Sequence, residues 1–278
     1  MSVVTASIVV HGSPAPQLAK VLGCLEADGI SHVFVIDNSD DERLRPVAEA
    51  CDICTYRHVE NRGFGAGHNF GIALARSMKS DFHVVLNADV CWSDPVIGPM
   101  AAYLEEHPGT VMLGPKVYYP DGTLQYSCRM LPAPADLICK RFLPASLSTR
   151  RMRRYLLADI SHDEPFECSY LLGSFLFFRM SALTASGGFD ERFFMYPEDI
   201  DITRRMSHLG KVLYWPRVSI IHEHAAASRH SARMLLIHIT NMCRYFSKWG
   251  WFFDKERRIA NRKMKSLPGA ANPEPGRG

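Results

Sequence analysis

Three carboxylates open a predicted helix late in the chain. Glu198, Asp199 and Asp201 stand at the start of the helix predicted over 197–209, which Gly210 ends. The helix dipole favours negative charge at this end, so the carboxylates could serve only to cap the helix. The segment before them, 188–196, is too aromatic for an ordinary solvated loop. It indicates a pocket wall around the acids.

Two more carboxylates come directly after predicted strands. Asp37 ends the strand predicted over 33–37, where its oxygens could accept hydrogen bonds from a base or ribose, or form a local turn. Asp89 follows the strand predicted over 82–87, where a carboxylate can hold a hard cation that bridges a diphosphate. Taken alone, each is an ordinary loop aspartate.

Histidines and glycines supply two further patterns. His222 and His224 flank Glu223 after a late strand and offer imidazole to a metal, although single histidines are more often structural, and the spacing is not that of a zincin. The glycine-rich run 63–67 lacks the spacing of a dinucleotide-binding loop or a P-loop. Its glycines would still let the backbone approach a ligand, and the helix that follows favours a phosphate at its start.

Alternating strands and helices must position these residues. Apolar, β-branched runs at 7–10, 33–37, 53–58 and 82–87 predict strands, and the helical patterns between them predict an open, doubly wound parallel sheet. Ligands bind such sheets beyond the carboxyl ends of the strands. The residues expected there are His11, Asp37, Glu60, Asn61 and Asn87 to Asp89.

The pattern changes after Gly114. Pro120, Asp121 and Gly122 predict the turn of a hairpin, 132–165 is irregular and basic like a loop or lid, and 168–179 is typical of a buried strand. A strand pair over 211–222 and a helix over 233–253 follow, and 266–278 is expected to be disordered.

The composition favours a globular protein of a reducing cytoplasm. The chain has 278 residues, 47% of them apolar, which can build a sizeable core. Its start lacks the pattern of a secretory signal, and its longest apolar runs are too short to span a bilayer. Its eight cysteines lack the density of a disulfide scaffold, and we interpret Cys51 and Cys54 as buried thiols rather than half a zinc site.

Together the motifs resemble family 2 glycosyltransferases with the GT-A fold, especially bacterial enzymes of the rhamnosyltransferase type. The resemblance covers about 7–248. It rests on the segments 35–39, 60–69, 86–89, 121–125, 188–201 and 222–224 with Ser228. It implies a doubly wound, mostly parallel central sheet, a mixed β and helical region on the acceptor side, and a C-terminal helix. The catalytic domain would span 1–253, with a nucleotide-binding half (1–110), a metal and acceptor half (111–230) and the helix (231–253), and 254–278 would be a basic, flexible tail.

The resemblance also implies roles for single residues. Asp199 looks like the catalytic base, with Glu198 on the acceptor side, and Asp89 and His222 look like ligands of Mg²⁺ or Mn²⁺. The residues expected to bind the nucleotide-sugar are His11, Asp37, Asn61, Gly63, Asn69 and Asn87. The mechanism implied is an in-line attack of the acceptor hydroxyl that inverts the anomeric carbon.

Three positions depart from the pattern of the family. Residues 11–13 read His-Gly-Ser where many relatives carry Thr-Tyr-Asn, Ala88 replaces a common proline, and Asn87 stands where other GT-A enzymes have a first aspartate. The metal is thereby one carboxylate short, which makes His222 more important.

The predicted reaction moves a sugar, L-rhamnose from dTDP-rhamnose, to a saccharide or lipid-linked acceptor in bacterial polysaccharide synthesis. The alternatives are a UDP-hexose donor and a non-catalytic sugar-nucleotide-binding scaffold. No nucleic-acid-binding module appears. Aromatic and basic residues interleave over 244–265, so this segment could rest on an anionic membrane surface at the inner face of the cell membrane, or its aromatic side chains could pack on the catalytic domain.

Overall fold

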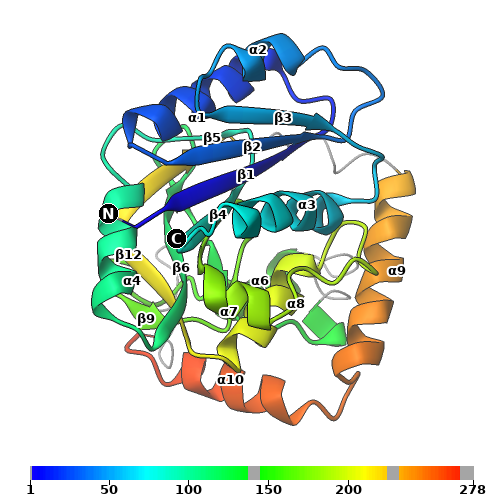
Figure 1. The fold of residues 1–278 in the computed structure, drawn as a ribbon. Coiled ribbons are helices and arrows are strands. Elements are labelled where there is room, and N and C mark those ends of the chain that lie inside the picture. The colour runs from blue at the N-terminus through cyan, green and yellow to red at the C-terminus, as the bar shows by residue number, and fades with distance from the viewer. Residues whose placement is uncertain (1, 137–144, 224–231, 270–278) are drawn as a thin grey trace.

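A ten-stranded mixed sheet forms the centre of the computed structural model, which describes residues 2–136, 145–223 and 232–269. Its main strand order is β3-β2-β1-β4-β11-β6-β12-β5. Figure 1 shows the sheet running through the molecule between two sets of helices. Residues 137–144, 224–231 and 270–278 lie outside the described part, so the predicted disorder of 266–278 is tested only at its first residues.

The first four predicted strands are confirmed. They are β1 (Val4–Val10), β2 (His32–Asp37), β3 (Cys54–His58) and β4 (Phe82–Leu86), and neighbours within the order β3-β2-β1-β4 are parallel. The connecting helices are α1 (Ala15–Ala27), α2 (Arg45–Glu49) and α3 (Phe64–Ser77). Because these four strands are parallel, their carboxyl ends share one edge of the sheet, as the alternating pattern predicts.

The second half of the sheet is built around an antiparallel insertion. β11 (Phe175–Arg179) lies between β4 and β6 (Thr110–Tyr118) and is antiparallel to both. β12 (Lys211–His222) then pairs parallel with β6 and antiparallel with β5 (Val90–Cys91). β9 (Phe166–Glu167) joins the edge of β12. The predicted strand pair over 211–222 is thus one strand, whose register against β6 shifts between Tyr214 and Ser219.

Helices cover both faces of the sheet. α1, α2 and α4 (Ile97–Glu106) share one apolar core with it. α3, α7 (Met180–Ala185) and α8 (Glu198–Ser207) share a second core on the other face. A third, smaller cluster joins the first turn of α8 to α9 (Ala232–Trp249) through Ile200, Tyr245 and Phe246. The predicted helix over 233–253 therefore exists but ends four residues early, where Gly250 turns the chain at a φ of 105°.

Two expected irregular regions contain helices. The loop predicted over 132–165 includes α6 (Ala145–Tyr155). The tail predicted to be flexible from 254 onward instead begins with α10 (Lys255–Lys265). Its basic composition suggested a solvated segment, but the Asp254 side chain caps the helix at Arg257 N, and Arg257 and Met264 are buried.

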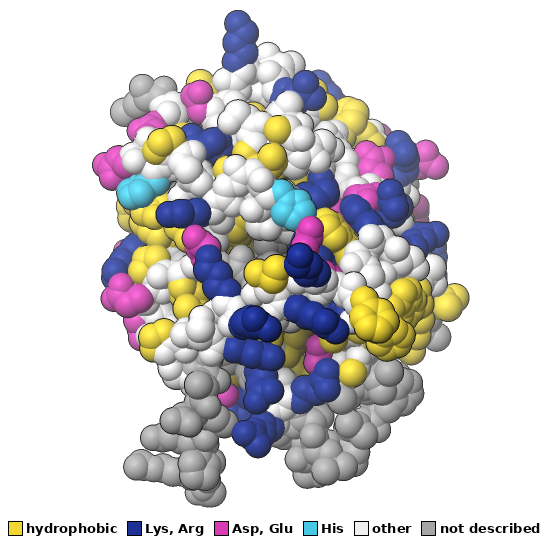
Figure 2. Space-filling view, turned by 90° about the horizontal axis from the view of Figure 1, so that it is seen from below, with side chains coloured by type: hydrophobic (Ala, Val, Ile, Leu, Met, Phe, Trp, Pro, Cys, Tyr) yellow, Lys and Arg dark blue, Asp and Glu magenta, His cyan; other side chains and the backbone are white. Residues whose placement is uncertain are grey.

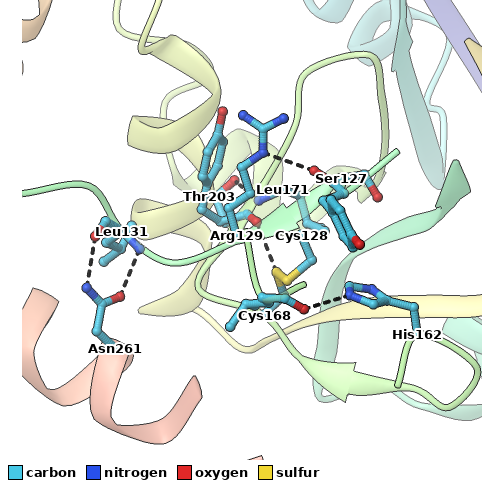
Figure 3. The surroundings of a disulfide bond; sticks show 12 residues. Ser127, Cys128, Arg129, Leu131, His162, Cys168, Leu171, Thr203 and Asn261 are labelled. Atoms are coloured by element: carbon cyan, nitrogen blue, oxygen red, sulfur yellow. Dashed lines mark hydrogen bonds between the residues drawn. A yellow bond between two sulfur atoms is a disulfide. The ribbon is translucent and has the colours of Figure 1, made fainter. Parts of the chain in front are cut away.

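A disulfide bond joins the segments that carry β8 and β10. Cys128 in β8 (Cys128–Arg129) is bonded to Cys168, just before β10 (Tyr170–Leu171), and β8 and β10 pair antiparallel (Figure 3). The sequence did not predict this pair. The cysteines are too sparse to indicate a disulfide scaffold, and the two partners are 40 residues apart. Cys51 and Cys54 are free thiols, as expected, but they are only partly buried.

Candidate active site

A carboxylate and an imidazole meet beyond the carboxyl ends of β4 and β12. Asp89 Oδ1 lies 3.2 Å from His222 Nε2, and Asn87 Nδ2 lies 3.4 Å from the same nitrogen. His222 Nδ1 donates a hydrogen bond to Gln125 Oε1 at 2.7 Å, from β7 (Leu124–Gln125). This bond fixes the tautomer in which Nε2 keeps its lone pair toward Asp89.

This pair suits a divalent cation. An imidazole lone pair and a carboxylate oxygen face each other at 3.2 Å. Both are electron donors, and one cation could be coordinated by both of them. Two ligands about 2.1 Å from Mg²⁺, at adjacent corners of an octahedron, stand about 3 Å apart. The described residues contain no cluster of three or more His, Cys, Asp or Glu that could hold a metal. The remaining ligands of such an ion would therefore have to come from elsewhere, and a diphosphate can supply them.

Asp199 lies at the first turn of α8 and is held by three hydrogen bonds. Its Oδ2 accepts from the Tyr170 hydroxyl at 3.0 Å and from Gly173 N at 3.1 Å, and its Oδ1 accepts from Ile200 N at 2.8 Å. Burial raises the pKa of Asp199, while the bonds from Tyr170 and Gly173 N oppose that rise by stabilising the anion. The carboxylate is therefore oriented and made more basic, as a proton acceptor requires.

Glu198 is a different kind of carboxyl group. It is buried, and burial followed by the charge of Asp199 raises its pKa to about 8. Its Oε2 and the Ser174 hydroxyl have no hydrogen-bond partner within the part of the chain that the structure describes. Two like carboxyl groups side by side cannot both ionise cheaply, so Glu198 carries the proton and leaves Asp199 as the anion at neutral pH.

Two adjacent residues connect this carboxylate to the segment between β4 and β5 that carries Asp89. Gly173 donates its N–H to Asp199, and the carbonyl of Ser174 accepts a hydrogen bond from Asn87 N at 3.1 Å. A Cβ at position 173 would lie 3.3 Å from the Asp199 Cβ, so the backbone approaches Asp199 closely and a small residue is favoured here. The predicted continuous strand over 168–179 is interrupted here, between β10 and β11. The segment at this interruption thus links Asp199 to Asn87, two residues before Asp89.

The predicted nucleoside side forms a second group at the same edge. His11 Nδ1 lies 2.9 Å from Asn38 O and 3.5 Å from Asn61 Nδ2, and Asn61 Oδ1 accepts from Gly63 N at 3.1 Å. Asp37 is fully buried. Its two oxygens accept from Ser39 N and from the Tyr56 hydroxyl, both at 2.8 Å. The Ser39 bond is the local turn that the sequence left open, and contact of Asp37 with a base stays a prediction.

The glycine run contacts protein rather than open space. A Cβ at Gly63 would lie 2.2 Å from Phe194 O, and one at Gly65 would lie 2.9 Å from Phe189 Cβ. Asn69 takes part in the same packing, because its amide bonds both Phe189 N and Phe189 O. α3 and the aromatic segment 188–196 are thus locked together. The expected ligand-binding roles of Asn69 and Gly63 stay predictions, and their observed contacts are structural.

Three residues of the site escaped the sequence analysis as functional residues: Tyr170, Gly173 and Gln125. Tyr170 and Gly173 lie 29 and 26 residues from the Asp199 that they bond. Gln125 belongs to the segment 121–125 that contributes to the resemblance, but nothing local links it to His222, 97 residues away. Only an unexpected glycine inside an apolar run, at Gly173, signals a close backbone approach.

Solved structures with this architecture share the GT-A fold. The structure of GalNAc-T7 with UDP, GalNAc and Mn²⁺ superposes with a TM-score of 0.64 at 14% identity, over 96% of this chain and 52% of that chain. A mannosyltransferase from Pyrobaculum calidifontis in complex with GDP-Man and Mn²⁺ gives 0.57 at 16% identity, over 97% and 73%. This chain spans about half the length of the first of these proteins. Its α/β architecture is that of the GT-A class, as expected.

Sequence comparison narrows the class. The model of glycosyl transferase family 2 matches residues 8–184, and the chain belongs to this family. An N-acetylglucosaminyl-diphospho-decaprenol L-rhamnosyltransferase, found in two strains of Mycobacterium tuberculosis, is 28% identical over 86% of this chain and 82% of its own length. The rhamnosyltransferase WbbL of Escherichia coli K12 is 25% identical over 96% of this chain and 98% of its own. The predicted resemblance is confirmed.

Proposed function

We propose that this chain transfers L-rhamnose from dTDP-rhamnose to a hydroxyl of a saccharide carried on a lipid diphosphate. The observation that supports it most is the junction at Gly173 and Ser174, which bonds both the Asp199 carboxylate and the backbone of Asn87, two residues before Asp89. Both bacterial relatives are rhamnosyltransferases, which suggests the sugar, and the mycobacterial enzyme acts on a lipid-linked saccharide, which suggests the class of acceptor.

The chain's own residues would carry out an inverting displacement. Asp199 Oδ1 or Oδ2 takes the proton of the acceptor hydroxyl as its oxygen forms the new bond to the anomeric carbon, and the bond from that carbon to the diphosphate breaks. Asp89 and His222 would hold Mg²⁺ or Mn²⁺, which neutralises the departing diphosphate when bound. Glu198, protonated and buried beside Asp199, would add no second negative charge next to the base.

We expect His11, Asn61 and Asn87 to bind the nucleotide-sugar, and Asp37 to support this side through the Ser39 turn. A UDP-hexose donor is the second candidate. The base and the sugar are recognised largely by backbone contacts and by the shape of the pocket, so the side chains of the site do not distinguish the two donors. A scaffold that only binds sugar nucleotides would need neither an oriented base nor a cation pair, so these features favour an enzyme.

Product-nucleotide release tests the proposal. The purified chain is given dTDP-rhamnose or UDP-hexoses, with and without an N-acetylglucosaminyl-diphospho-polyprenol acceptor, and we expect release only of dTDP and only with the acceptor. The anomeric configuration of the product, read by NMR, should be inverted. Release of UDP instead would establish the second candidate, and no release with any donor would support the scaffold.

The metal makes a separate prediction. Excess chelator should abolish turnover, and Asp89→Ala should weaken both donor binding and turnover, because it removes one of two described ligands. Asp52→Ala, an exposed aspartate next to β3, is the matched control and should leave both unchanged. Full turnover in excess chelator would refute metal dependence.

A further inference from the structure

The turn between α9 and α10 exposes three aromatic side chains in succession. Trp251, Phe252 and Phe253 expose 39%, 72% and 89% of their surfaces. Burying such side chains is strongly favourable, and monomeric soluble proteins rarely leave contiguous apolar patches in water. Ile259, one turn into α10, exposes 60%. These four residues form what we call the aromatic tip.

The outward face of α10 is strongly basic. Lys255, Arg258, Arg262 and Lys265 are exposed, and no ion pair joins any of them to another described residue. Lys263, by contrast, is paired with Glu167. Figure 2 looks onto the face where α10 lies and shows Lys and Arg side chains gathered in its middle, with hydrophobic side chains beside them. We call these four cations the basic face.

The exposure of the aromatic tip does not come from loose packing of the segment that carries it. Arg204 of α8 forms an ion pair with Asp254, at 2.8 Å, and both side chains are almost completely buried. Arg204 also stacks on the ring of Trp249, 3.9 Å from its centroid. Arg257 donates to the carbonyl of Trp251 at 2.9 Å. The turn is therefore held firmly from inside, with the Trp251 ring packed against Phe246, while the side chains of Phe252 and Phe253 are largely exposed.

The same anchors lead to the active site. Arg204 and Asp199 belong to one helix, α8. On α10, Asn261 exchanges two hydrogen bonds with the backbone of Leu131, both at 2.8 Å (Figure 3). Leu131 lies two residues beyond Arg129, whose charge acts on Asp199. The aromatic tip and basic face are thus connected, through α8 and the segment around Leu131, to elements that surround Asp199.

We propose that the aromatic tip and the basic face together dock this enzyme on an anionic lipid surface. The inference rests on the proposed lipid-linked acceptor, and it names the residues that would bring the enzyme to that acceptor. Aromatic rings suit the interface between headgroups and acyl chains, and unpaired cations beside them complement anionic headgroups. A flat lipid surface can engage both features at once. An acidic protein would leave the aromatic tip in water, and a second copy would bring like charges together.

Vesicle flotation tests this surface. Among the described helices, none is long and apolar enough to cross a membrane. The full chain should float with vesicles that contain phosphatidylglycerol, float poorly with phosphatidylcholine alone, and release at high salt because salt screens exposed charges. Phe252→Ser with Phe253→Ser, and separately Arg258→Glu with Arg262→Glu, should each lower partitioning about tenfold or more.

Matched controls separate this inference from the proposed function. Arg76→Glu with Lys79→Glu changes two exposed cations at the end of α3 and should not affect flotation. All three double variants should keep wild-type turnover on a water-soluble acceptor analogue, since none touches the site. The proposal would be overturned if partitioning does not depend on lipid charge, or if both docking variants still bind vesicles as the wild type does. It would also be overturned if the chain forms a dimer without lipid and the aromatic variant is a monomer. Flotation can succeed even if the donor is not dTDP-rhamnose, so the two proposals fail separately.

Discussion

Asp199 and Glu198 are neighbours in sequence but differ in their surroundings. Tyr170, Gly173 N and Ile200 N all donate to Asp199, whereas Glu198 Oε2 has no partner among the described residues. Hydrogen bonds stabilise the anion of the first, and burial stabilises the neutral form of the second. One carboxyl group can thus accept a proton at neutral pH while the other holds its own.

Exchange of each carboxyl group for its amide distinguishes these roles. Asp199→Asn should lower kcat by about two to four decades with donor affinity retained, the usual contribution of a positioned base. Glu198→Gln should lower kcat less than about tenfold at neutral pH, since glutamine resembles the protonated acid. Single-turnover rates and donor binding measured on both variants check this. The opposite ranking would make Glu198 the base.

The pH dependence follows from the same shifts. A fall in pH through the raised pKa of Asp199 protonates the base, so kcat should fall on the acid side. Because the pKa of Glu198 is raised in the folded chain, its contribution to stability is present below the ordinary value of 4.5 and is lost as pH rises toward about 8. Glu198→Gln should remove that loss, which denaturant unfolding across this range would measure.

Tyr170 is a positioning residue for the base. Tyr170→Phe removes one donor to Asp199 without creating a cavity, so the pKa of Asp199 should rise further and the acid limb of the kcat profile should move to higher pH. A lost bond to a charged group predicts about a tenfold lower kcat at neutral pH. Tyr245→Phe, which removes a bond to Arg204, is the buried control. An unshifted profile in Tyr170→Phe would leave the tyrosine a purely structural role.

α3 shows at the scale of an element why glycines recur near the site. Gly67 and Gly71 face β1 so closely that a Cβ would lie 2.7 Å from Val9 Cγ2 and 2.6 Å from Ser7 Cβ. Such a helix has poor intrinsic stability, since each interior glycine costs about 1 kcal/mol relative to alanine. Its close contact with the sheet offsets that cost and sets the start of the helix beside the site.

A pair of glycine substitutions tests this account. Gly71→Ala should destabilise the fold by about 1–3 kcal/mol, because the methyl group collides with Ser7. Gly23→Ala in α1, where nothing lies within 4 Å of the added Cβ, should stabilise it by about 0.5–1 kcal/mol. Denaturant unfolding of both variants measures the two signs. Equal effects would mean that helix propensity, and not packing against β1, decides both positions.

Over the whole molecule, the sequence predicted the elements that depend on neighbouring residues, namely strands and a turn. The four parallel strands and the hairpin at Gly122 follow from periodicity and turn residues, and β4 ends three residues before Asp89. Contacts between distant residues were not foreseen. Tyr170 meets Asp199, and Asp254 meets Arg204 across 50 residues, only after the sheet has assembled. The basic composition of α10 hid a helix that two buried side chains anchor.

The disulfide bond between Cys128 and Cys168 has a consequence for the unfolded chain. The bond closes a loop of the chain that contains α6. Such a closed loop restricts the conformations that the denatured protein can reach. For a loop of this length, the loss of chain entropy corresponds to about 4 kcal/mol of stability. Oxidised and reduced preparations are then two different thermodynamic systems with one amino-acid sequence. A melting temperature therefore has a definite meaning for this protein only when the redox state of the sample is stated with it.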